Sequence, residues 1–535
     1  MADLFDDYPT GAAWDEVFDR TGAVRPAYSH VRDTLVQLSE SELRGRADAL
    51  ARSYLNQGVT FDFAGEERPF PLDVAPRVID GDVWDAVSPG VAQRVRALEA
   101  FLADVYGAQR AVADGVVPHS LITSSTHFHR AAHGIEPPNG VRVQVAGIDL
   151  VRDEAGDFRV LEDNVRVPSG VSYVLSNRRA MAQTFPELFA ALRIRPVSDY
   201  PRRLLAALTA AAPAGVDDPT VVVLTPGVFN SAYFEHSLLA RTMGVELVEG
   251  RDLFCSGGRV WMRTTQGRRR VDVIYRRVDD EYLDPVAFRQ DSLLGSPGLM
   301  TCARLGTVTI ANAVGNGVAD DKLVYTYVPE LIRYYLGEEP LIANVDTWRL
   351  EDPGALEEVL DRLDELVVKP VDGSGGKGLV IGPAATAAEL DQLRSRLRRD
   401  PRGWIAQPVV QLSTVPTLVE DGLRPRHVDL RPFAVNDGEN VWVLPGGLTR
   451  VALPEGELVV NSSQGGGSKD TWVLGGVPPA RSRRVAEHPQ AVPVGSSVPI
   501  DANPDDLRAQ SMQQQQSSRS TTPSPCRDGV AVARC

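Results

Sequence analysis

A glycine-rich segment between two short apolar runs is the most constraining feature of this chain. It reads VVKPVDGSGGKGLVIGP and extends from Val367 to Pro383. Three of its glycines satisfy the spacing G-x-G-x-x-G of dinucleotide-binding loops. Such a loop must end a strand and open a helix, because the pyrophosphate binds at the helix N-terminus. Here Leu379–Ile381 predicts a second strand instead, and the next helix is expected only near Ala387.

The segment also fails as a Walker loop. Lys377 is followed by Gly378 rather than by serine or threonine, and Val371 stands where the first glycine is required. We therefore predict a β-hairpin with a glycine-rich tip, a flap whose backbone N–H groups can cover phosphates. Lys369 lies within the first strand, where burial without a partner is costly. The alternative is an exposed strand lysine beside a flexible loop.

Composition limits the classes of function. The chain has 535 residues, which predicts two to four domains, and 43% of them are hydrophobic, as in ordinary globular proteins. A net charge of −15 disfavours nucleic acid as the main partner, since phosphate-backbone binding needs a basic face. The acidic N-terminus lacks the features of a signal peptide, no apolar run is long enough to span a membrane, and the four cysteines show no paired spacing. We expect a cytoplasmic protein that does not bind membranes.

Hydrophobic periodicity divides the chain into regions. A helix with a capping box is predicted from Thr386 and Glu389, with leucines on one face. The expected order is a helical N-terminal region (1–135), a β-rich segment (136–199), an α/β domain (200–320), a second α/β unit (321–412), a mainly β segment (413–477) and a disordered tail (478–535).

Three oxygen-bearing side chains lie on two predicted strands in GIDLVRDEAGDFRVLEDN. A turn at 153–156 would bring Asp149 close to Glu162. Glu162 and Asn164, two residues apart, project from the same face of one strand. Two carboxylates and an amide oxygen suit Mg²⁺, which keeps several waters and binds substrate phosphates. The alternative is a solvated acidic strand end.

The two segments together resemble the ATP-grasp ligases, such as D-alanine–D-alanine ligase and glutathione synthetase. D-x12-E-x-N followed by Pro-Ser-Gly is similar to their metal motif, and V-V-K-P with a glycine-rich hairpin is similar to their nucleotide lysine and phosphate flap. In ordinary members the lysine half comes first, whereas here the metal half precedes it by about 200 residues. With the segments TPGVFNSAYFEH, NGVADDK, RHVDLRPF and GGLTRVAL, the chain therefore resembles the circularly permuted ATP-grasp proteins, distantly akin to glutathionylspermidine synthetase, over about residues 10–475.

The resemblance implies a mixed α+β and α/β fold, the ATP-grasp fold in circularly permuted order, that holds ATP with two Mg²⁺. It implies that Asp149, Glu162 and Asn164 bind the metal ions, and that Gln407 and Val409 border adenine. Gln407 departs from the acidic residue usual in the family. The remaining implied nucleotide contacts are Lys322, Lys369, Gly373, Ser374, Gly375, Gly376, Lys377, Asp429, Arg431 and Lys469, with Arg450 as a further phosphate ligand.

One departure concerns catalysis. D-alanine–D-alanine ligase has an arginine two residues before the metal aspartate, where this chain has Gly147. Arg166, Arg276 and Arg277 are the candidates to replace it, because guanidinium groups bind carboxylates and acyl phosphates in a bidentate manner. A histidine pair in HFHRAAH has a metal-binding spacing, but structural histidines are the favoured interpretation.

The expected activity is ATP-dependent formation of an amide or peptide bond, through an acyl phosphate, between carboxylate and amine substrates that are small molecules or peptides. A small-molecule kinase and a non-catalytic ATP-binding scaffold are the alternatives.

Overall fold

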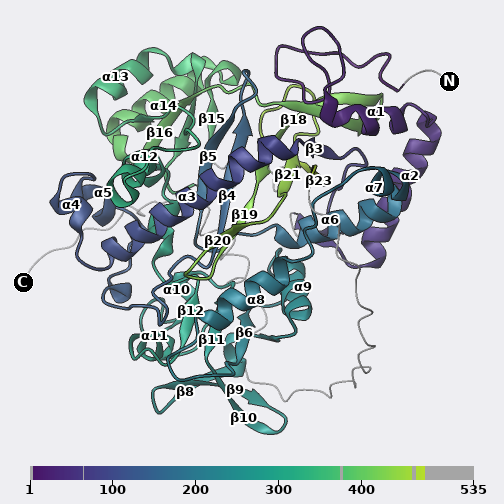
Figure 1. Cartoon of the computed structure of the whole chain (residues 1–535). Helices are drawn as coiled ribbons and strands as arrows, with labels where there is room; N and C mark the ends of the chain where they lie inside the picture. Colours follow the sequence, from purple (N-terminus) through teal and green to yellow (C-terminus); the bar gives the residue numbers. More distant parts are fainter. Residues whose placement is uncertain (1–3, 64–65, 374–377, 461–465, 476–535) are drawn as a thin grey trace, which may run out of the picture.

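A large, mostly antiparallel sheet forms the centre of the molecule. The computed structural model describes residues 4–63, 66–373, 378–460 and 466–475. The strand order is β20-β19-β4-β18-β21-β22, with β5 paired to β4 and β17 paired to β18 (Figure 1). The strands are β4 (Val145–Arg152), β5 (Phe158–Asn164), β17 (Thr414–Val419), β18 (Gly422–Arg431), β19 (Phe433–Asn436), β20 (Val441–Val443), β21 (Leu448–Val451) and β22 (Gly467–Lys469).

The glycine-rich segment lies in a separate four-stranded sheet of order β13-β16-β14-β15, with its own hydrophobic core. This smaller lobe stands beside the upper end of β5 (Figure 1). The antiparallel pairing of β14 with β15 confirms the predicted hairpin, and the capping box before α14 is present. The elements are β13 (Trp348–Arg349), β14 (Leu366–Pro370), β15 (Val380–Ile381), β16 (Trp404–Pro408), α12 (Lys322–Leu336), α13 (Pro353–Asp361) and α14 (Ala387–Arg399).

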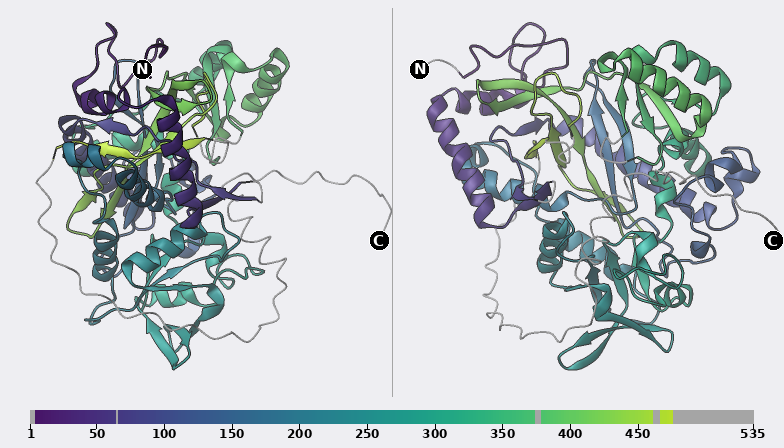
Figure 2. Two further views of the ribbon diagram at one scale, coloured as in Figure 1. Left: turned by 90° about the vertical axis from the view of Figure 1, so that its right-hand side faces the viewer. Right: turned by 180° about the vertical axis from the view of Figure 1, so that it is seen from behind.

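A parallel sheet of order β12-β11-β6-β7 forms the α/β region at the opposite end of the molecule (Figure 2). A three-stranded antiparallel sheet, β10-β9-β8, projects from it. The strands are β6 (Val221–Leu224), β7 (Glu246–Val248), β8 (Leu253–Ser256), β9 (Arg259–Thr264), β10 (Gly267–Val271), β11 (Val273–Arg276) and β12 (Thr309–Ala311). The helices are α8 (Tyr200–Ala210), α9 (Tyr233–Met243), α10 (Asp280–Leu283) and α11 (Leu299–Arg304).

The N-terminal helices pack around the central sheet. Helix α3 carries an apolar stripe that includes Val91, Leu98 and Phe101, and it contacts β19, β20 and α12. Strand β3 pairs in parallel with β23, so a strand of the N-terminal region pairs with the last strand of the described chain. The remaining elements are α1 (Ser29–Leu35), α2 (Glu40–Asn56), β1 (Thr60–Phe63), β2 (Glu66–Pro69), β3 (Arg77–Ile79), α3 (Gly81–Val105), α4 (Arg110–Ala113), α5 (His119–Thr123), α6 (Val171–Thr184), α7 (Pro186–Ala191) and β23 (Thr471–Val473). No helix in these ranges is long and apolar enough to cross a bilayer.

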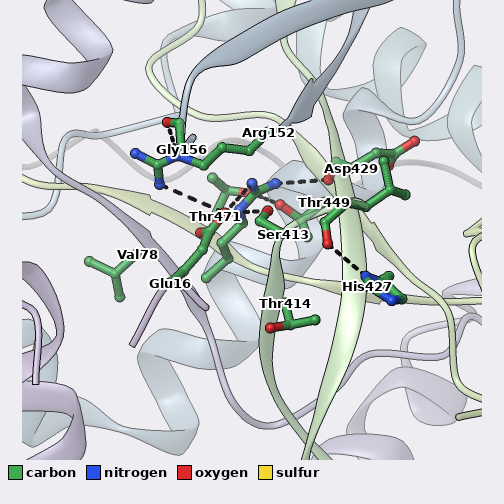
Figure 3. Close-up of polar contacts among 12 residues, drawn as sticks. Glu16, Val78, Arg152, Gly156, Ser413, Thr414, His427, Asp429, Thr449 and Thr471 are labelled. Carbon is green, nitrogen blue, oxygen red and sulfur yellow. Dashed lines mark hydrogen bonds and ion pairs between the residues drawn. The ribbon is translucent and has the colours of Figure 1, made fainter. Parts of the chain in front are cut away.

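A buried ion pair ties the N-terminal segment to the central sheet. Arg77 donates to both carboxylate oxygens of Glu16 at 2.6 and 3.0 Å, and both side chains are at most 1% exposed. Ser413 also donates to Glu16 at 2.7 Å (Figure 3). Arg77 donates to the backbone carbonyl of Asp429 at 2.9 Å. Glu16 thus stabilises an arginine that supports the strand carrying Asp429.

We predict that Glu16→Ala lowers the free energy of unfolding by about 3–5 kcal/mol, because it leaves the guanidinium of Arg77 buried without its counterion. Urea denaturation followed by circular dichroism measures this change. The matched control is Asp391→Ala, which removes an exposed ion pair with Arg394 and should change stability by less than about 0.5 kcal/mol. Equal effects of the two variants would contradict the prediction.

Candidate functional site

The predicted oxygen cluster lies on the hairpin of β4 and β5. Asp149 pairs directly with Glu162, and Gly147 pairs with Asn164, with a register shift after Asp149. The backbone N–H of Gly156 donates to the carbonyl of Asp153, which confirms the predicted turn at 153–156. The hairpin therefore brings the two carboxylates and the amide together, as the sequence pattern predicted.

Asp149 is held by two arginines from neighbouring strands. Arg431 of β18 donates to both of its carboxylate oxygens at 2.5 and 2.7 Å, and Arg450 of β21 donates to Oδ2 at 2.6 Å. Arg450 is in turn bound by Asp429, which is 1% exposed. Although burial alone would raise the pKa of Asp149, the two guanidinium groups lower it to about 2. Asp149 is therefore ionised at any physiological pH.

The absent side chain at position 147 makes room for one of these arginines. A Cβ atom on Gly147 would lie 3.1 Å from Cδ of Arg431 and 3.2 Å from Cβ of Pro168. A larger residue would displace Arg431 from Asp149. The glycine that departs from the family pattern thus admits an arginine from another strand, since β18 runs beside β4.

The oxygen set fits a divalent cation. Side-chain exposure of Glu162 is 23%, and its described ion-pair contact is Lys322, with Nζ 3.4 Å from Oε2. Asn164 lies beside Asp149, with Nδ2 3.5 Å from Oδ1. Oδ2 of Asp149 accepts from both arginines, whereas Oδ1 accepts from Arg431 and, at the long distance of 3.5 Å, from Asn164, so a rotation of the Asn164 amide would free one direction of Oδ1 for a cation. Hard oxygen ligands of this kind suit Mg²⁺.

Two lysines face this hairpin from the smaller lobe. Lys322 opens α12 and donates to the carbonyl of Gly373 at the base of the flap, while it also pairs with Glu162. Lys369 on β14 donates to Oε1 of Gln407 at 2.6 Å. Burial and the nearby Lys322 lower the pKa of Lys369 to about 8. The two ammonium groups form a cationic site with limited compensation from carboxylates.

The contacts of Gln407 account for an amide at a position where the family usually has an acidic residue. It is 2% exposed on β16, accepts from Lys369, and donates to the hydroxyl of Thr347 at 3.0 Å. An amide orients the lysine without neutralising it, whereas a carboxylate would form an ion pair and compete with an incoming phosphate. Val409 follows the end of β16 and is half-buried. The flap tip, Ser374, Gly375, Gly376 and Lys377, lies outside the described residues.

The structure separates the three candidate arginines. Arg276 is fully buried and donates to the carbonyls of Asn312, Val278 and Ala313, with Asp280 as its ion-pair partner. Arg277 is 2% exposed and binds Glu235 and the hydroxyl of Tyr275. These hydrogen bonds of both side chains are made within the α/β region rather than to the β4–β5 hairpin.

Arg166 differs from Arg276 and Arg277, because its contacts are long ion pairs. It follows β5 by two residues, 3.5 Å from Asp320 and 3.7 Å from Asp279, and its side chain is 14% exposed. No hydrogen bond from its guanidinium to another described residue is present. The segment is fixed by Asn312, which donates to the carbonyls of Val165 and Val145. Arg166 thus keeps its donors available beside the metal-binding hairpin.

Sequence reasoning missed the groups around Arg166. Asp320 accepts from the backbone N–H of Val165 at 2.7 Å, and burial raises its pKa to about 7. Burial and Arg166 lower the pKa of His127, so this ring is neutral at pH 7. His127 also packs against Gly317, where a Cβ would lie 2.8 Å from it. The segment HFHRAAH forms a loop and a single 3₁₀ turn rather than an α-helix. The described residues contain no group of three or more His, Cys, Asp or Glu positioned for a metal.

Three further implied contacts have partners within the fold. Lys469 is fully buried and donates to Asp73 and to the carbonyls of Ala75 and Pro416, so its three protons are used within the fold. Asp429, an implied nucleotide contact, is 1% exposed and accepts hydrogen bonds from Arg450. Arg450 itself is committed to Asp429 and Asp149, which makes it a support for Asp149 rather than a phosphate ligand.

Composition contains a signal that motif reading overlooked. The chain has only four lysines among its 56 basic residues, Lys322, Lys369, Lys377 and Lys469. All other fixed cations are arginines. Two of the four lie at the site, and a third belongs to the flap segment. Lysine, whose ammonium group is a compact, strongly hydrated charge with three rotatable donors, is thus concentrated where phosphates would bind.

The chain belongs to the circularly permuted ATP-grasp type 2 family, whose model matches residues 76–452. An uncharacterised protein of Mycobacterium tuberculosis is 63% identical over 86% of this chain and 84% of its own length, and one of Synechocystis is 54% identical over 88% and 98%. A protein of Frankia casuarinae named putative glutamate–cysteine ligase 2-2 is 48% identical, and the match covers 87% of this chain but 54% of that protein. A glutathione synthetase-like effector of Globodera pallida shares the fold, with a TM-score of 0.53, 11% identity and coverage of 82% and 98%.

We predict that the rate at which an amine-reactive acylating reagent modifies Lys369 rises with pH, with a midpoint near pH 8. Only the neutral amine reacts, and Lys369 loses its proton near its lowered pKa. Peptide mass spectrometry resolves the four lysines individually. The fully buried Lys469 serves as the unreactive internal control. A midpoint above pH 10 for Lys369 would contradict its burial beside Lys322.

Proposed function

We propose that this protein is an ATP-dependent carboxylate–amine ligase that forms an amide or peptide bond through an acyl phosphate. One observation carries the proposal. Lys322 contacts both Glu162 of the metal-binding hairpin and the carbonyl of Gly373 at the base of the flap. The cationic and anionic halves of a phosphate site, about 200 residues apart in sequence, therefore meet at one side chain.

Family membership and the printed names of the relatives support the same chemistry. The ATP-grasp family matches 76–452, which includes both halves of the site. A relative named as a putative glutamate–cysteine ligase favours C–N bond formation over other outcomes of phosphoryl transfer. These comparisons support a ligase in general terms, and the acyl phosphate and the substrates are part of our proposal.

Each residue has a defined task. Asp149, Glu162 and Asn164 would hold Mg²⁺, which neutralises the β- and γ-phosphates when bound. Lys369 and Lys322 would bind phosphate oxygens as point charges. Gly373 and the flap would cover the phosphates, and β16 with Gln407 and Val409 would border the purine. Arg431 keeps Asp149 ionised and oriented, with Arg450 and Asp429 behind it.

Arg166 would bind the carboxylate substrate. A carboxylate oxygen attacks the γ-phosphorus of ATP, the bond to the β,γ-bridging oxygen breaks, and ADP leaves. The amine then attacks the acyl carbon, phosphate departs with the C–O bonding electrons, and the amine loses its proton. The guanidinium fork stabilises negative charge on the carbonyl oxygen in the second step. The protein supplies position and electrostatics rather than a nucleophile.

A small-molecule kinase is the alternative that the missing arginine at position 147 would favour, since acyl transfer needs a donor to the developing oxyanion. Arg431 fills the space beside Gly147, so this observation no longer favours a kinase. A pure scaffold has no need for an ionised metal-binding aspartate held by two arginines. The ligase is therefore the single function that we put forward.

We predict ADP and phosphate release only when a carboxylate, an amine and Mg²⁺ are supplied together. Arg166→Gln should lower kcat by about 10²–10³ with little change in KM for ATP, because it removes a donor to the developing oxyanion. The matched control is Arg394→Gln, a half-buried arginine on α14. A coupled ADP assay against pooled amino acids, polyamines and peptides measures both.

Several outcomes would contradict the ligase. AMP and pyrophosphate as products would exclude the acyl-phosphate route, and a stable phosphorylated product without condensation would identify a kinase. Undiminished turnover by Glu162→Ala would remove the hairpin from the mechanism. Equal losses in Arg166→Gln and Arg394→Gln would show that Arg166 has no special role.

A further inference from the structure

The outer face of the β8–β10 sheet is unusually cationic. Because side chains alternate along a strand, Val260, Met262 and Val271 face the core, and their neighbours face outward. The outward set is Arg259, Trp261 and Arg263 on β9, Arg268 and Arg270 on β10, and Phe254 on β8, as the register confirms. We refer to these six residues as the arginine face. The sheet projects at the end of the molecule opposite to the smaller lobe in Figures 1 and 2.

Most of this charge has no counterion. Arg270 pairs with Asp272 at 2.8 Å. Within the described part of the chain, no carboxylate lies within ion-pair distance of Arg259, Arg263 or Arg268, which are all exposed. Such a cluster stands out in a chain with a net charge of −15.

Two of the unpaired arginines face each other directly. Arg263 and Arg268 are register partners on adjacent antiparallel strands. Like charges at such positions destabilise a sheet, and an exposed position would accept many other residues. The arrangement therefore carries a cost that an anion between the two guanidinium groups would remove.

Aromatic rings hold these arginines in place. Arg268 lies over the ring of Trp261 at 4.5 Å, and Arg263 lies over the ring of Phe254 at 4.9 Å. The stacking covers the ring faces and orders the guanidinium planes before a ligand arrives. Nη1 of Arg263 also donates to the backbone carbonyls of Arg251 and Leu253 at 2.5 and 3.0 Å. The other edge of this guanidinium, formed by Nε and Nη2, can make a bidentate contact to a carboxylate.

The sheet also has an open edge. In the described chain, β10 pairs with β9 and with no other strand. An extended segment from another protein could add along β10 through backbone hydrogen bonds, and its alternate side chains would then lie beside Arg268 and Arg270.

We propose that the arginine face docks an extended acidic segment of a partner polypeptide. Glutamate or aspartate at alternate positions would place a carboxylate between Arg263 and Arg268. Single-stranded nucleic acid fits less well, because base stacking needs exposed ring faces and both rings are covered by arginine. This inference does not depend on the proposed ligase activity.

The test uses the full-length protein without ATP. Fluorescence anisotropy with a fluorescein-labelled hexaglutamate peptide should show binding that weakens as salt increases. Arg263→Gln/Arg268→Gln should weaken this binding at least tenfold, while Arg398→Gln, an exposed arginine on α14, should leave it unchanged. A thermal melt should show that the double variant stays folded with a midpoint close to that of the native protein, because the lost contacts of Arg263 to two backbone carbonyls oppose the relief of the repulsion.

Four results would overturn the proposal. They are no binding of hexaglutamate to the native protein, equal binding to the double variant, equal loss in Arg398→Gln, and tighter binding of labelled hexathymidylate than of hexaglutamate. The first three would leave the arginines as protection of a sheet edge against aggregation. The last would identify nucleic acid as the ligand class. Because the measurement needs no turnover, failure of the ligase proposal would not affect it.

Discussion

The ion pairs around Asp149 are the interaction on which the arrangement of the site depends. A carboxylate that is 2% exposed would ordinarily be protonated or excluded, but Arg431 and Arg450 hold it ionised. Each arginine comes from a different strand of the central sheet, so the pairs also fix β4 relative to β18 and β21. The support continues outward, since Arg77 binds the backbone of Asp429 and Glu16 neutralises Arg77. An N-terminal segment that contributes no site residue thus determines how the metal-binding hairpin is held.

The same arrangement divides the basic residues by task. Arginine, with a planar fork and a permanent charge, occupies the buried pairs, as at Arg77, Arg276 and Arg450. Lysine appears four times: Lys322 and Lys369 lie at the candidate site, Lys377 falls in the glycine-rich segment, and Lys469 is buried within the fold. Burial, and after it the nearby charge of Lys322, lowers the pKa of Lys369. Phosphate binding would remove this repulsion.

Local patterns predicted the elements well where a single strand or turn was sufficient. The hairpin of Asp149 and Glu162, the flap hairpin and the capped helix α14 are all present, because period-2 alternation, turn residues and capping boxes act over a few residues. The family and its fold were also recognisable from combined motifs. Individual roles were less accessible. Arg276, Arg277 and Lys469 have the right residue type and neighbourhood in sequence, yet their donors are used by carbonyls and carboxylates far along the chain.

The sequence by itself determined the family, the circularly permuted order of the two halves, and the two hairpins that carry the proposed metal ligands and the proposed phosphate lysine Lys369. These depend on residue types at short, fixed spacings. Only the tertiary structure decided which arginine is available to a substrate, why position 147 is glycine, and that Asp320 and His127 surround Arg166. Those properties depend on which side chains fill the same space, and residues such as Gly147 and Arg431, 284 positions apart, share that space only after the sheet has formed.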